Sequence, residues 1–494
     1  MIGFEESRGE RSHPDVTKMF FIFALFLIFS LCFSVLLLFL FKPLSSSSNP
    51  YKILPPSPPR LPIIGNLHQL GSSPHRSLQA MAQSYGQLML LHLGTVPVLV
   101  ASSTDVAQEI MKTHDLIFSN RPKINYGEYW RQAKSIAVLH ILTNKRVQSY
   151  RKVRRDETSL LIKKIQESNE SLVNLSELII SLTNNVICRV ALGRTYDGKK
   201  FKNLLERFLE LLGSFSVGSY IPFLRWVDWL SGLEQRADYV AKEFNDFFDG
   251  VIEEHINKKL VNTEGLDIVD ILLEIERDNT IGFHLERDEI KAIIMDIFAG
   301  GTDTTFTNLE WAISELLRHP QAMKKLQQEA REIGQGKSMI TEDDLDKMPY
   351  LKSILKETLR LHPPLPLLVP HESTQDVKLL GYDITAGTRV IVNAWAIARD
   401  SSTWTEPNEF QPERFLNNPI DYKGFHFELI PFGAGRRGCP AIQFAMIVNE
   451  LVLANLVYKF DLKVAEGEDL DMSETNGLTV HKKYPIFVTA THYY

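Results

Sequence analysis

The strongest constraint on the fold is an apolar run near the start of the chain. Residues 19–41 carry no charge and are interrupted only by Ser30 and Ser34. About 20 apolar residues cross the hydrocarbon core of a bilayer, and a lone segment can do so only as a helix. A cleaved signal peptide has a shorter apolar part, and a buried core helix shows an apolar stripe instead. We therefore expect one transmembrane anchor over residues 19–41, after a polar extension over residues 1–18.

The charges that flank this run indicate its orientation. Lys42, Lys52 and Arg60 follow it with no acidic residue between them, whereas the charges before it are mixed in sign. Basic residues are retained on the cytoplasmic side, so we expect a single-pass protein whose main body faces the cytosol. The Ser/Pro-rich residues 42–60 follow, and their prolines exclude a continuous helix or strand. This segment is either a stiff hinge or a plain spacer.

Residues 61–494 show no second linker, repeat or low-complexity segment, which indicates one large domain. Amphipathic periods predict helices around residues 147–168, 199–212, 234–259, 286–318 and 320–333. Strand patterns predict a hairpin over residues 88–93 and 96–101, and further strands near residues 377–392 and 478–490. The expected fold class is therefore mainly α with small β-sheets (α+β).

Charge and cysteine content exclude two further classes. The formal net charge of −6 provides no broad cationic field, so we expect no nucleic-acid partner. The three cysteines, Cys32, Cys188 and Cys439, are too few and too scattered for a disulfide scaffold, which favours a reducing compartment.

Residues 431–440 (Pro-Phe-Gly-Ala-Gly-Arg-Arg-Gly-Cys-Pro) are the segment richest in chemical information. Their three glycines permit backbone conformations that other residues avoid. Arg436 and Arg437 precede Cys439, and a helical pattern over residues 441–458 follows it. Nearby cations and a helix N-terminus both stabilise a thiolate, so we expect Cys439 to be thiolate-prone. A buried structural cysteine is the simpler alternative.

The same glycines also spell G-x-G-x-x-G, the pattern of a dinucleotide-binding loop. Pro431 stands where the first strand of such a unit should end, and few residues follow Asp461 to complete a nucleotide-binding sheet. A nicotinamide-dependent membrane enzyme is therefore a weak alternative.

Residues 299–305 (Ala-Gly-Gly-Thr-Asp-Thr-Thr) interrupt the long helical pattern of residues 286–318. Each glycine costs a helix about 1 kcal/mol relative to alanine, so a compensating function is expected. The Thr304 hydroxyl can bond the carbonyl of Gly300 four residues back, which would open a groove for a small molecule. A notch for helix packing is the equal alternative.

Glu357 and Arg360 are three residues apart, on one face of a helix that the following prolines end. Taken alone, this spacing describes an ordinary surface ion pair. Arg414, within Pro-Glu-Arg-Phe at residues 412–415, could join Glu357 in a buried network.

The glycine loop with its single cysteine, the interrupted helix, and Glu-x-x-Arg followed by Pro-Glu-Arg-Phe together resemble the cytochrome P-450 family of haem-thiolate monooxygenases. The resemblance runs from residue 19 to residue 494. Residues 62–67 (Pro-Ile-Ile-Gly-Asn-Leu) and 126–131 (Tyr-Gly-Glu-Tyr-Trp-Arg) are similar to the plant microsomal A-type. The resemblance implies a cytochrome P-450 fold over residues 61–494, behind one N-terminal transmembrane helix.

The resemblance also implies roles for individual residues. Cys439 corresponds to the thiolate that ligates the haem iron. The haem-contacting positions are Arg437, Trp130, Lys134, His371 and Phe432. Asp303 and Thr304 correspond to the oxygen-activating pair, and Glu357, Arg360 and Arg414 to a structural network behind the haem. The positions expected to contact substrate are Phe298, Ala299, Leu365, Leu367, Leu368 and Val369.

The implied activity is insertion of one oxygen atom of O₂ into a lipophilic small molecule, a plant specialised metabolite, with haem b as cofactor. A thiolate ligand pushes electron density towards the iron and favours O–O cleavage. No flavin or nicotinamide domain is recognisable in the sequence, so electrons must come from another protein. The resemblance implies an NADPH-dependent flavoprotein reductase in the same membrane.

One connection departs from the family pattern. Only Ile124 and Asn125 separate Lys123 from Tyr126, where relatives of this type carry a long loop that roofs the substrate pocket. The alternative to an active enzyme is therefore an inactive or substrate-impaired relative with a shortened loop at residues 123–126.

Overall fold

A computed structural model describes residues 23–31, 33–34, 52–122, 129–196, 198–257, 266–277, 285–464, 470–475 and 477–493. Residues 23–31, within the expected anchor, are helical. The polar extension, the rest of the anchor except residues 33–34, the hinge up to residue 51 and the connection at 123–126 lie outside the described residues.

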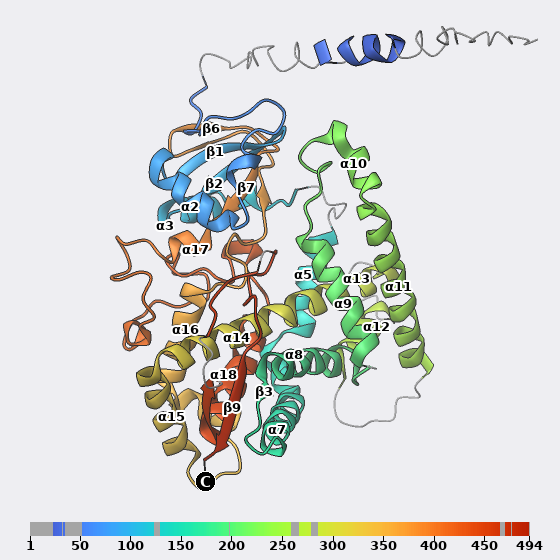
Figure 1. The fold of residues 1–494 in the computed structure, drawn as a ribbon. Coiled ribbons are helices and arrows are strands. Elements are labelled where there is room, and N and C mark those ends of the chain that lie inside the picture. Colours follow the sequence, from blue (N-terminus) through green and yellow to red (C-terminus); the bar gives the residue numbers. More distant parts are fainter. Residues whose placement is uncertain are drawn as a thin grey trace, which may run out of the picture.

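The main body is mostly helical, as the sequence predicts (Figure 1). In chain order its helices and helical turns are η1 (Leu67–Gln69), α2 (Pro74–Tyr85), α3 (Thr104–Gln108), η2 (Glu109–Thr113), α4 (Asp115–Phe118), α5 (Tyr129–Ile136), η3 (Ala137–Ile141), α6 (Asn144–Ser149), α7 (Arg151–Glu167), α8 (Leu175–Leu192), α9 (Gly198–Gly213), η4 (Pro222–Leu224), α10 (Arg225–Leu230), α11 (Leu233–Asn257), α12 (Ile268–Arg277), α13 (Arg287–Gly301), α14 (Asp303–Arg318), α15 (Pro320–Gly334), η6 (Glu342–Lys347), α16 (Pro349–Leu361), α17 (Ala394–Ile397), η7 (Pro412–Phe415), η8 (Gly435–Arg437) and α18 (Ile442–Lys459).

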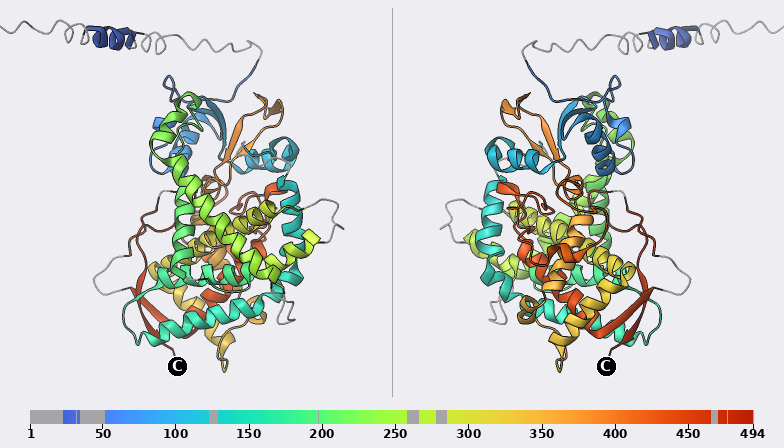
Figure 2. Two further views of the ribbon diagram at one scale, coloured as in Figure 1. Left: turned by 90° about the vertical axis from the view of Figure 1, so that its right-hand side faces the viewer. Right: turned by 90° about the vertical axis from the view of Figure 1, so that its left-hand side faces the viewer.

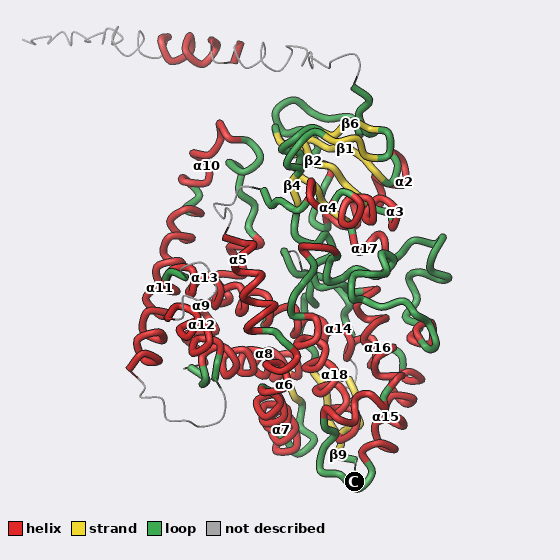
Figure 3. Tube along the Cα trace, turned by 180° about the vertical axis from the view of Figure 1, so that it is seen from behind, coloured by secondary structure: helices red, strands yellow, loops and turns green. Residues whose placement is uncertain are grey.

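The strands form small sheets near two ends of the helical body, seen from behind in Figure 3. They are β1 (Leu88–Leu93), β2 (Val96–Ala101), β3 (Val173–Asn174), β4 (His371–Glu372), β5 (Val377–Leu379), β6 (Tyr382–Ile384), β7 (Arg389–Val392), β8 (Phe460–Val464) and β9 (Phe487–His492). One sheet has the order β1-β2-β7-β4, a second has β3-β9-β8, and β5 pairs with β6. The predicted hairpin is confirmed, with Leu88 opposite Ala101.

The strand predicted near residues 478–490 is only partly correct. The structure forms β9 from Phe487 onward and leaves residues 477–486 outside the named strands. Those residues instead place backbone and side-chain groups against α14, as in the hydrogen bond from Trp311 Nε1 to the Val480 carbonyl at 2.9 Å. Tertiary contacts thus override the local strand pattern there.

The core lies where α14 crosses the helical body between α8, α16 and α18 (Figures 1 and 2). α8 and α18 are long and apolar enough to cross a membrane, but both are mostly buried in the fold. They are core helices, because their apolar surfaces face neighbouring helices rather than solvent. α13 starts with a capping box between Glu286 and Glu289, which fixes where the central helix begins.

The proline-rich segment before the body packs against the first sheet. Leu90 N–H donates to the Pro56 carbonyl at 2.9 Å, and buried Asn66 accepts from the His92 N–H at 2.9 Å. A Cβ on Gly65 would lie 2.0 Å from the His92 carbonyl oxygen. Only glycine lets the chain approach the strand this closely, so residues 56–66 have a fixed path along β1.

Candidate active site

Backbone contacts that require glycine hold the loop around Cys439. Gly433 and Gly435 have φ of 68° and 63°, the left-handed region that glycine favours. A Cβ on Gly435 would lie 2.2 Å from the Met111 carbonyl oxygen. The Cys439 N–H donates to the Phe432 carbonyl at 2.9 Å. The loop therefore sets the position of the sulfur just before α18.

The two arginines that precede Cys439 in sequence interact with residues of other segments. Arg436 pairs with Asp115 at 2.7 Å, and Arg437 Nε donates to the Ser119 carbonyl at 2.5 Å. Burial raises the pKa of the Cys439 thiol, and the Ala441 N–H and Lys134 only partly offset this. Burial thus opposes ionisation of the thiol, whereas a coordinating metal ion would deprotonate it outright. That Cys439 is thiolate-prone stays a prediction.

Access to the sulfur is compatible with such a ligand. Cys439 retains accessible surface, although protein atoms surround the sulfur closely enough to raise its pKa. Cys188, by contrast, is buried on α8, and burial raises its pKa to about 12. Phe432 is half-buried beside the loop, with its ring edge-on to Tyr422 at a centroid distance of 5.6 Å.

Four basic side chains gather around the Cys439 loop. Lys134 Nζ, from α5, donates to two backbone carbonyls of the loop. Arg121 donates to the carbonyls of residues 369 and 370, and His371 Nδ1 bonds the backbone at the end of α4 at 2.8 Å. Arg437 is the fourth member. Trp130 lies one turn before Lys134 on α5, and its side chain lies outside the described residues.

These basic groups repel one another. Burial and Arg437 lower the pKa of Arg121 to about 10, and burial, Arg121 and Arg437 lower the pKa of His371 to about 4. Burial and the same two arginines lower the pKa of Lys134. Crowding like charges in a partly buried place is unfavourable unless an anion joins them. The cluster therefore suits a ligand with carboxylate groups.

The central helix is interrupted at Thr302, between α13 and α14. The Thr304 hydroxyl donates to the Gly300 carbonyl at 2.6 Å, which confirms the bond that the sequence predicts. A Cβ on Gly300 would meet nothing within 4 Å, whereas one on Gly301 would lie 2.6 Å from Ile187 Cδ1. Gly301 is therefore a packing notch, as one interpretation predicts, whereas Gly300 borders open space and a groove for a small molecule stays a prediction.

Asp303 is the first residue of α14. The residue is 6% exposed, and its carboxylate accepts a hydrogen bond from the Thr479 hydroxyl. Thr304 is half-buried and bonds backward along the helix instead. The structure therefore brings the two residues to one helix break, but their side chains use different partners.

The residues expected to contact substrate divide into two groups. Phe298 has no exposed surface, because it packs edge-on against Phe201 at 4.9 Å, on a different side of α13 from Gly300. Leu368 is also buried, and Leu367 packs against the core beneath the first sheet. Substrate contact by Phe298 and Leu368 stays a prediction, and both side chains are part of the packed core.

The remaining candidates keep accessible surface near the helix break. Ala299 and Leu365 are half-buried, and Val369 is 45% exposed. The Val480 N–H donates to the Pro364 carbonyl at 2.9 Å, so the residues after α16 lie beside the segment that contacts Asp303. That Leu365 and Val369 contact substrate stays a prediction.

Glu357 and Arg360 are fully buried on α16 rather than on the surface. Arg360 donates to both carboxylate oxygens of Glu357, at 2.7 and 2.8 Å. Arg414 Nε and the Gln411 N–H also donate to Glu357 Oε1, at 3.0 and 2.8 Å. Arg360 further bonds three backbone carbonyls between residues 398 and 409. The network ties α16 to the loop that precedes the Cys439 segment.

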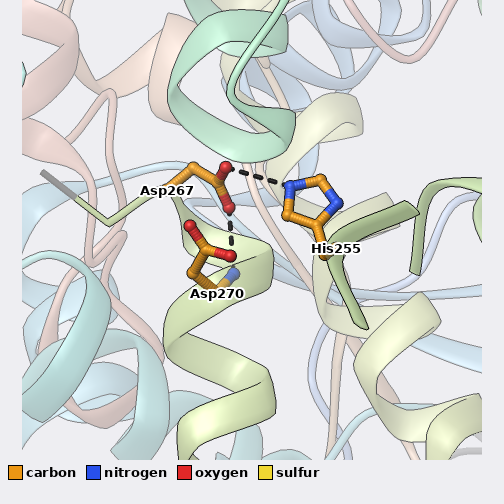
Figure 4. Close-up of side chains that lie close together, drawn as sticks. All are labelled: His255, Asp267 and Asp270. Atoms are coloured by element: carbon orange, nitrogen blue, oxygen red, sulfur yellow. Dashed lines mark hydrogen bonds and ion pairs between the residues drawn. The ribbon is translucent and has the colours of Figure 1, made fainter. Parts of the chain in front are cut away.

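A second cluster of titratable groups lies between α11 and α12 (Figure 4). His255 Nδ1 bonds the Val251 carbonyl at 2.7 Å, and Nε2 bonds Asp267 at 3.0 Å. Both acceptors favour a protonated ring nitrogen, and against the effect of burial the hydrogen bond and charge of Asp267 raise the pKa of His255. His255 and Asp267 thus form a buried ion pair that joins α11 to the start of α12.

The dinucleotide interpretation of the glycine loop is wrong. The residues before Gly433 form turns rather than a strand, and α18 leads into β8, which pairs antiparallel with β9. A dinucleotide fingerprint needs a strand before the loop and parallel strands around it.

Two site residues escape sequence reasoning. Arg121 looks like an ordinary loop residue, and only the fold brings it to Arg437 and His371. Thr479 is separated from Asp303 by 176 residues, so no local sequence pattern predicts their contact. Contacts between such distant residues can be found only from the tertiary structure.

Comparison with known proteins gives consistent matches. A family model described as "Cytochrome P450" matches residues 55–489. A protein named "3-beta-hydroxylase" from Tanacetum parthenium is 55% identical over 472 residues, which cover 91% of this chain and 95% of that protein. "Cytochrome P450 71A26" from Arabidopsis thaliana is 52% identical, with coverages of 88% and 93%, and "Norfluorocurarine oxidase" from Strychnos sp is 51% identical, with coverages of 92% and 95%. The similarity extends over every segment that builds the candidate site.

Proposed function

The chain belongs to the cytochrome P450 family, as a plant A-type member, and on this premise we propose that it oxidises a lipophilic small molecule at the endoplasmic reticulum membrane. It is a monooxygenase, and its cofactor is haem b bound through a cysteine thiolate. Thiolate-ligated haem iron supplies the chemistry that splits O₂, so that one oxygen atom enters the substrate and the other becomes water.

The observation that carries the residue assignments is the cluster of mutually repelling basic groups beside Cys439. Haem b has two propionate carboxylates, which suit Arg121, Lys134 and Arg437. Cys439 has accessible surface for the iron, and its thiol lies in a loop whose backbone is fixed. We assign Cys439 as the iron ligand. Trp130, His371 and Phe432 are assigned as further haem contacts.

The interrupted helix would supply the groups that deliver protons to oxygen at the haem. Gly300 leaves open space, and the Thr304 hydroxyl borders it while bonded to the Gly300 carbonyl. Asp303 is the carboxylate beside this break. Asp303 and Thr304 are therefore assigned to proton transfer, because cleavage of the O–O bond consumes protons.

Electrons are proposed to come from an NADPH-dependent flavoprotein reductase. The family match occupies residues 55–489, so a redox partner must carry the flavin. A second proposed partner is the bilayer. Phe223, Trp226, Trp229 and Leu230 are each more than half exposed on η4 and α10, at the same end of the body as the β5–β6 pair (Figure 1). Exposed aromatic side chains of this kind settle at membrane interfaces.

The substrate class follows from the apolar residues near the helix break and from the relatives. Leu365 and Val369 offer apolar surface there, which favours a lipophilic ligand. The relatives' names describe a hydroxylase and an oxidase. Hydroxylation of a lipophilic plant metabolite is the reaction these observations support.

Cys439→Ala tests this function directly. The reduced, carbon-monoxide-treated protein should show a red-shifted Soret band, and Cys439→Ala should lose it because the iron loses its thiolate. Cys188→Ala is the matched control, since Cys188 is buried on α8 and should leave the band intact. A Cys439→Ala protein that retains the shifted band would rule out this ligand. Wild-type protein without bound haem would favour the impaired relative instead.

A further inference from the structure

Asp303 depends on one partner from a distant part of the chain. Its carboxylate is buried, and within the described part of the chain the Thr479 hydroxyl is the one side chain that hydrogen-bonds it. A buried carboxylate that loses its donor bears the full cost of desolvation. The direction in which this carboxylate points is therefore controlled by Thr479.

The backbone around Thr479 is fixed against the helices that it faces. The next residue, Val480, donates its N–H to the Pro364 carbonyl at 2.9 Å and accepts from Trp311 Nε1 at 2.9 Å. The Lys482 N–H donates to Glu310 Oε2 at 3.2 Å. Three hydrogen bonds thus attach residues 480–482 to α14 and to the end of α16. Thr479 itself is β-branched, which restricts its side-chain rotamers.

Neighbouring residues of a helix point about 100° apart, so Asp303 and Thr304 cannot both face the same group without adjustment. Their hydrogen bonds reflect this, because Thr304 bonds the Gly300 carbonyl and Asp303 bonds Thr479. Whether Asp303 can supply protons to the open space at Gly300 therefore depends on how firmly Thr479 holds its carboxylate.

We propose that Thr479 is a positioning residue, which holds the Asp303 carboxylate in the orientation from which it supplies protons to the space bordered by Gly300 and Thr304. This proposal rests on the proposed monooxygenase function. Without the hydroxyl, the carboxylate would turn towards another donor, and proton delivery would slow. Thr479 does not touch the reacting atoms, so its effect passes through Asp303.

The consequence is a change in how oxygen is used. In productive turnover, O₂, NADPH, one proton and the substrate give hydroxylated product, water and NADP⁺. In the unproductive route, O₂, NADPH and one proton give hydrogen peroxide and NADP⁺. Slower proton delivery favours the second route. The share of NADPH recovered as hydrogen peroxide therefore reports the position of Asp303.

The first experiment uses the full-length, haem-loaded protein in vesicles with an NADPH-dependent flavoprotein reductase and the lipophilic probe 7-ethoxycoumarin. In Thr479→Val, which keeps the shape but removes the hydroxyl, we expect the productive rate to fall about tenfold, a small part of what a placed proton donor contributes. The peroxide share should rise accordingly. Thr479→Ser should restore the wild-type share.

The matched control is Thr475→Val. Thr475 lies in the same segment, and its hydroxyl bonds the His481 carbonyl at 3.1 Å rather than Asp303. Loosening the segment without touching Asp303 should leave the peroxide share at the wild-type value. An equal rise in Thr475→Val and Thr479→Val would overturn the proposal, because general loosening would then explain both.

The second experiment does not depend on activity. The unfolding midpoints of Thr479→Val, Asp303→Asn and the double variant form a double-mutant cycle. Non-additive effects support the contact, and additive effects overturn it. Non-additive stability with an unchanged peroxide share also overturns the proposal, because Thr479 would then be structural only.

Failure of the proposed function gives a different result. If Asp303→Asn leaves the peroxide share unchanged while the carbon monoxide spectrum is normal, the assignment of Asp303 is wrong, and with it the role of Thr479. If the wild-type protein lacks the shifted Soret band, the monooxygenase function itself fails. The cycle in unfolding midpoints still decides whether Thr479 holds Asp303.

Discussion

At the scale of single residues, the two glycines of the helix break differ in what surrounds them. Gly301 faces Ile187 of α8, and Gly300 faces open space next to Thr304. A sequence pattern treats both as helix breakers. The structure shows that Gly301 allows two helices to approach and that Gly300 borders open space.

Substitution by alanine should separate these roles. Gly300→Ala should raise the free energy of unfolding by about 1 kcal/mol, since alanine favours helix and its Cβ meets nothing within 4 Å. The same change should weaken ligand-induced shifts of the haem spectrum, because the methyl group narrows the space. Thermal unfolding and ligand titration measure the two effects.

Gly301→Ala is the matched comparison. Its Cβ would lie 2.6 Å from the end of the Ile187 side chain, which must move. The clash should cancel the gain in helix propensity, so the variant should be no more stable than the wild type. Equal stability and equal ligand binding in the two variants would contradict the distinct roles.

At the scale of elements, buried ionic groups tie helices to their neighbours. Glu357 joins α16 to the loop before the Cys439 segment, and His255 joins α11 to α12. In both cases burial opposes the charges, so the partners must remain together. Loss of one partner leaves the other charge uncompensated.

Glu357→Ala should therefore destabilise the protein by about 3 to 5 kcal/mol, because buried Arg360 and partly buried Arg414 lose their carboxylate. The variant should fold poorly and retain little haem. Haem content per purified protein and the unfolding midpoint provide the measurements. Glu406→Ala is a control within the same loop, and normal folding of Glu357→Ala would show that the network is dispensable.

The His255–Asp267 pair predicts a pH dependence. Burial opposes the imidazole charge, but the hydrogen bond and charge of Asp267 outweigh it and raise the pKa of His255 above its usual 6.5. A group whose pKa is raised by folding stabilises the fold fully below pH 6.5, and this stabilisation is lost as the pH rises through the raised value. His255→Gln should flatten that loss in denaturation curves, whereas the same change at exposed His68 should not.

Local patterns account for most elements and only part of the site. The hairpin, the amphipathic helices and the hydrogen bond from Thr304 to Gly300 each depend on residues that are close in sequence. The sequence therefore predicts them. Arg121, Thr479 and the burial of Phe298 depend on contacts between distant segments. The sequence places Arg436 close to Cys439, but only the fold shows that Arg436 pairs with Asp115.

At the scale of the whole molecule, the site is assembled from segments across residues 121–480. The segments that hold Cys439 and Glu357 are joined by hydrogen bonds among described residues. The shortened connection at residues 123–126 lies outside them. We therefore expect the connection to affect substrate selection more than haem binding.

A relative's loop inserted between Asn125 and Tyr126 should tighten ligand-induced spectral shifts. Covering apolar ligand surface contributes roughly 25 cal/mol for each Å² removed from water. The carbon monoxide spectrum should not change, and a Gly/Ser loop of equal length should give no tightening. Binding of one lipophile by the native chain at about −8 kcal/mol or better would contradict this expectation.

α8 has a further consequence during synthesis. It is apolar and long enough to cross a bilayer, and it becomes buried only when α13 and α14 pack on it. Those helices begin about 100 residues later, so at usual translation rates α8 is synthesised roughly 5 to 20 s before they are. In that interval the membrane-insertion machinery can insert α8 as a transmembrane helix. Arg189 of α8 pairs with Asp156 and Glu157 of α7. Because α7 is synthesised before α8, these ion pairs can form early and disfavour insertion of α8 into the bilayer.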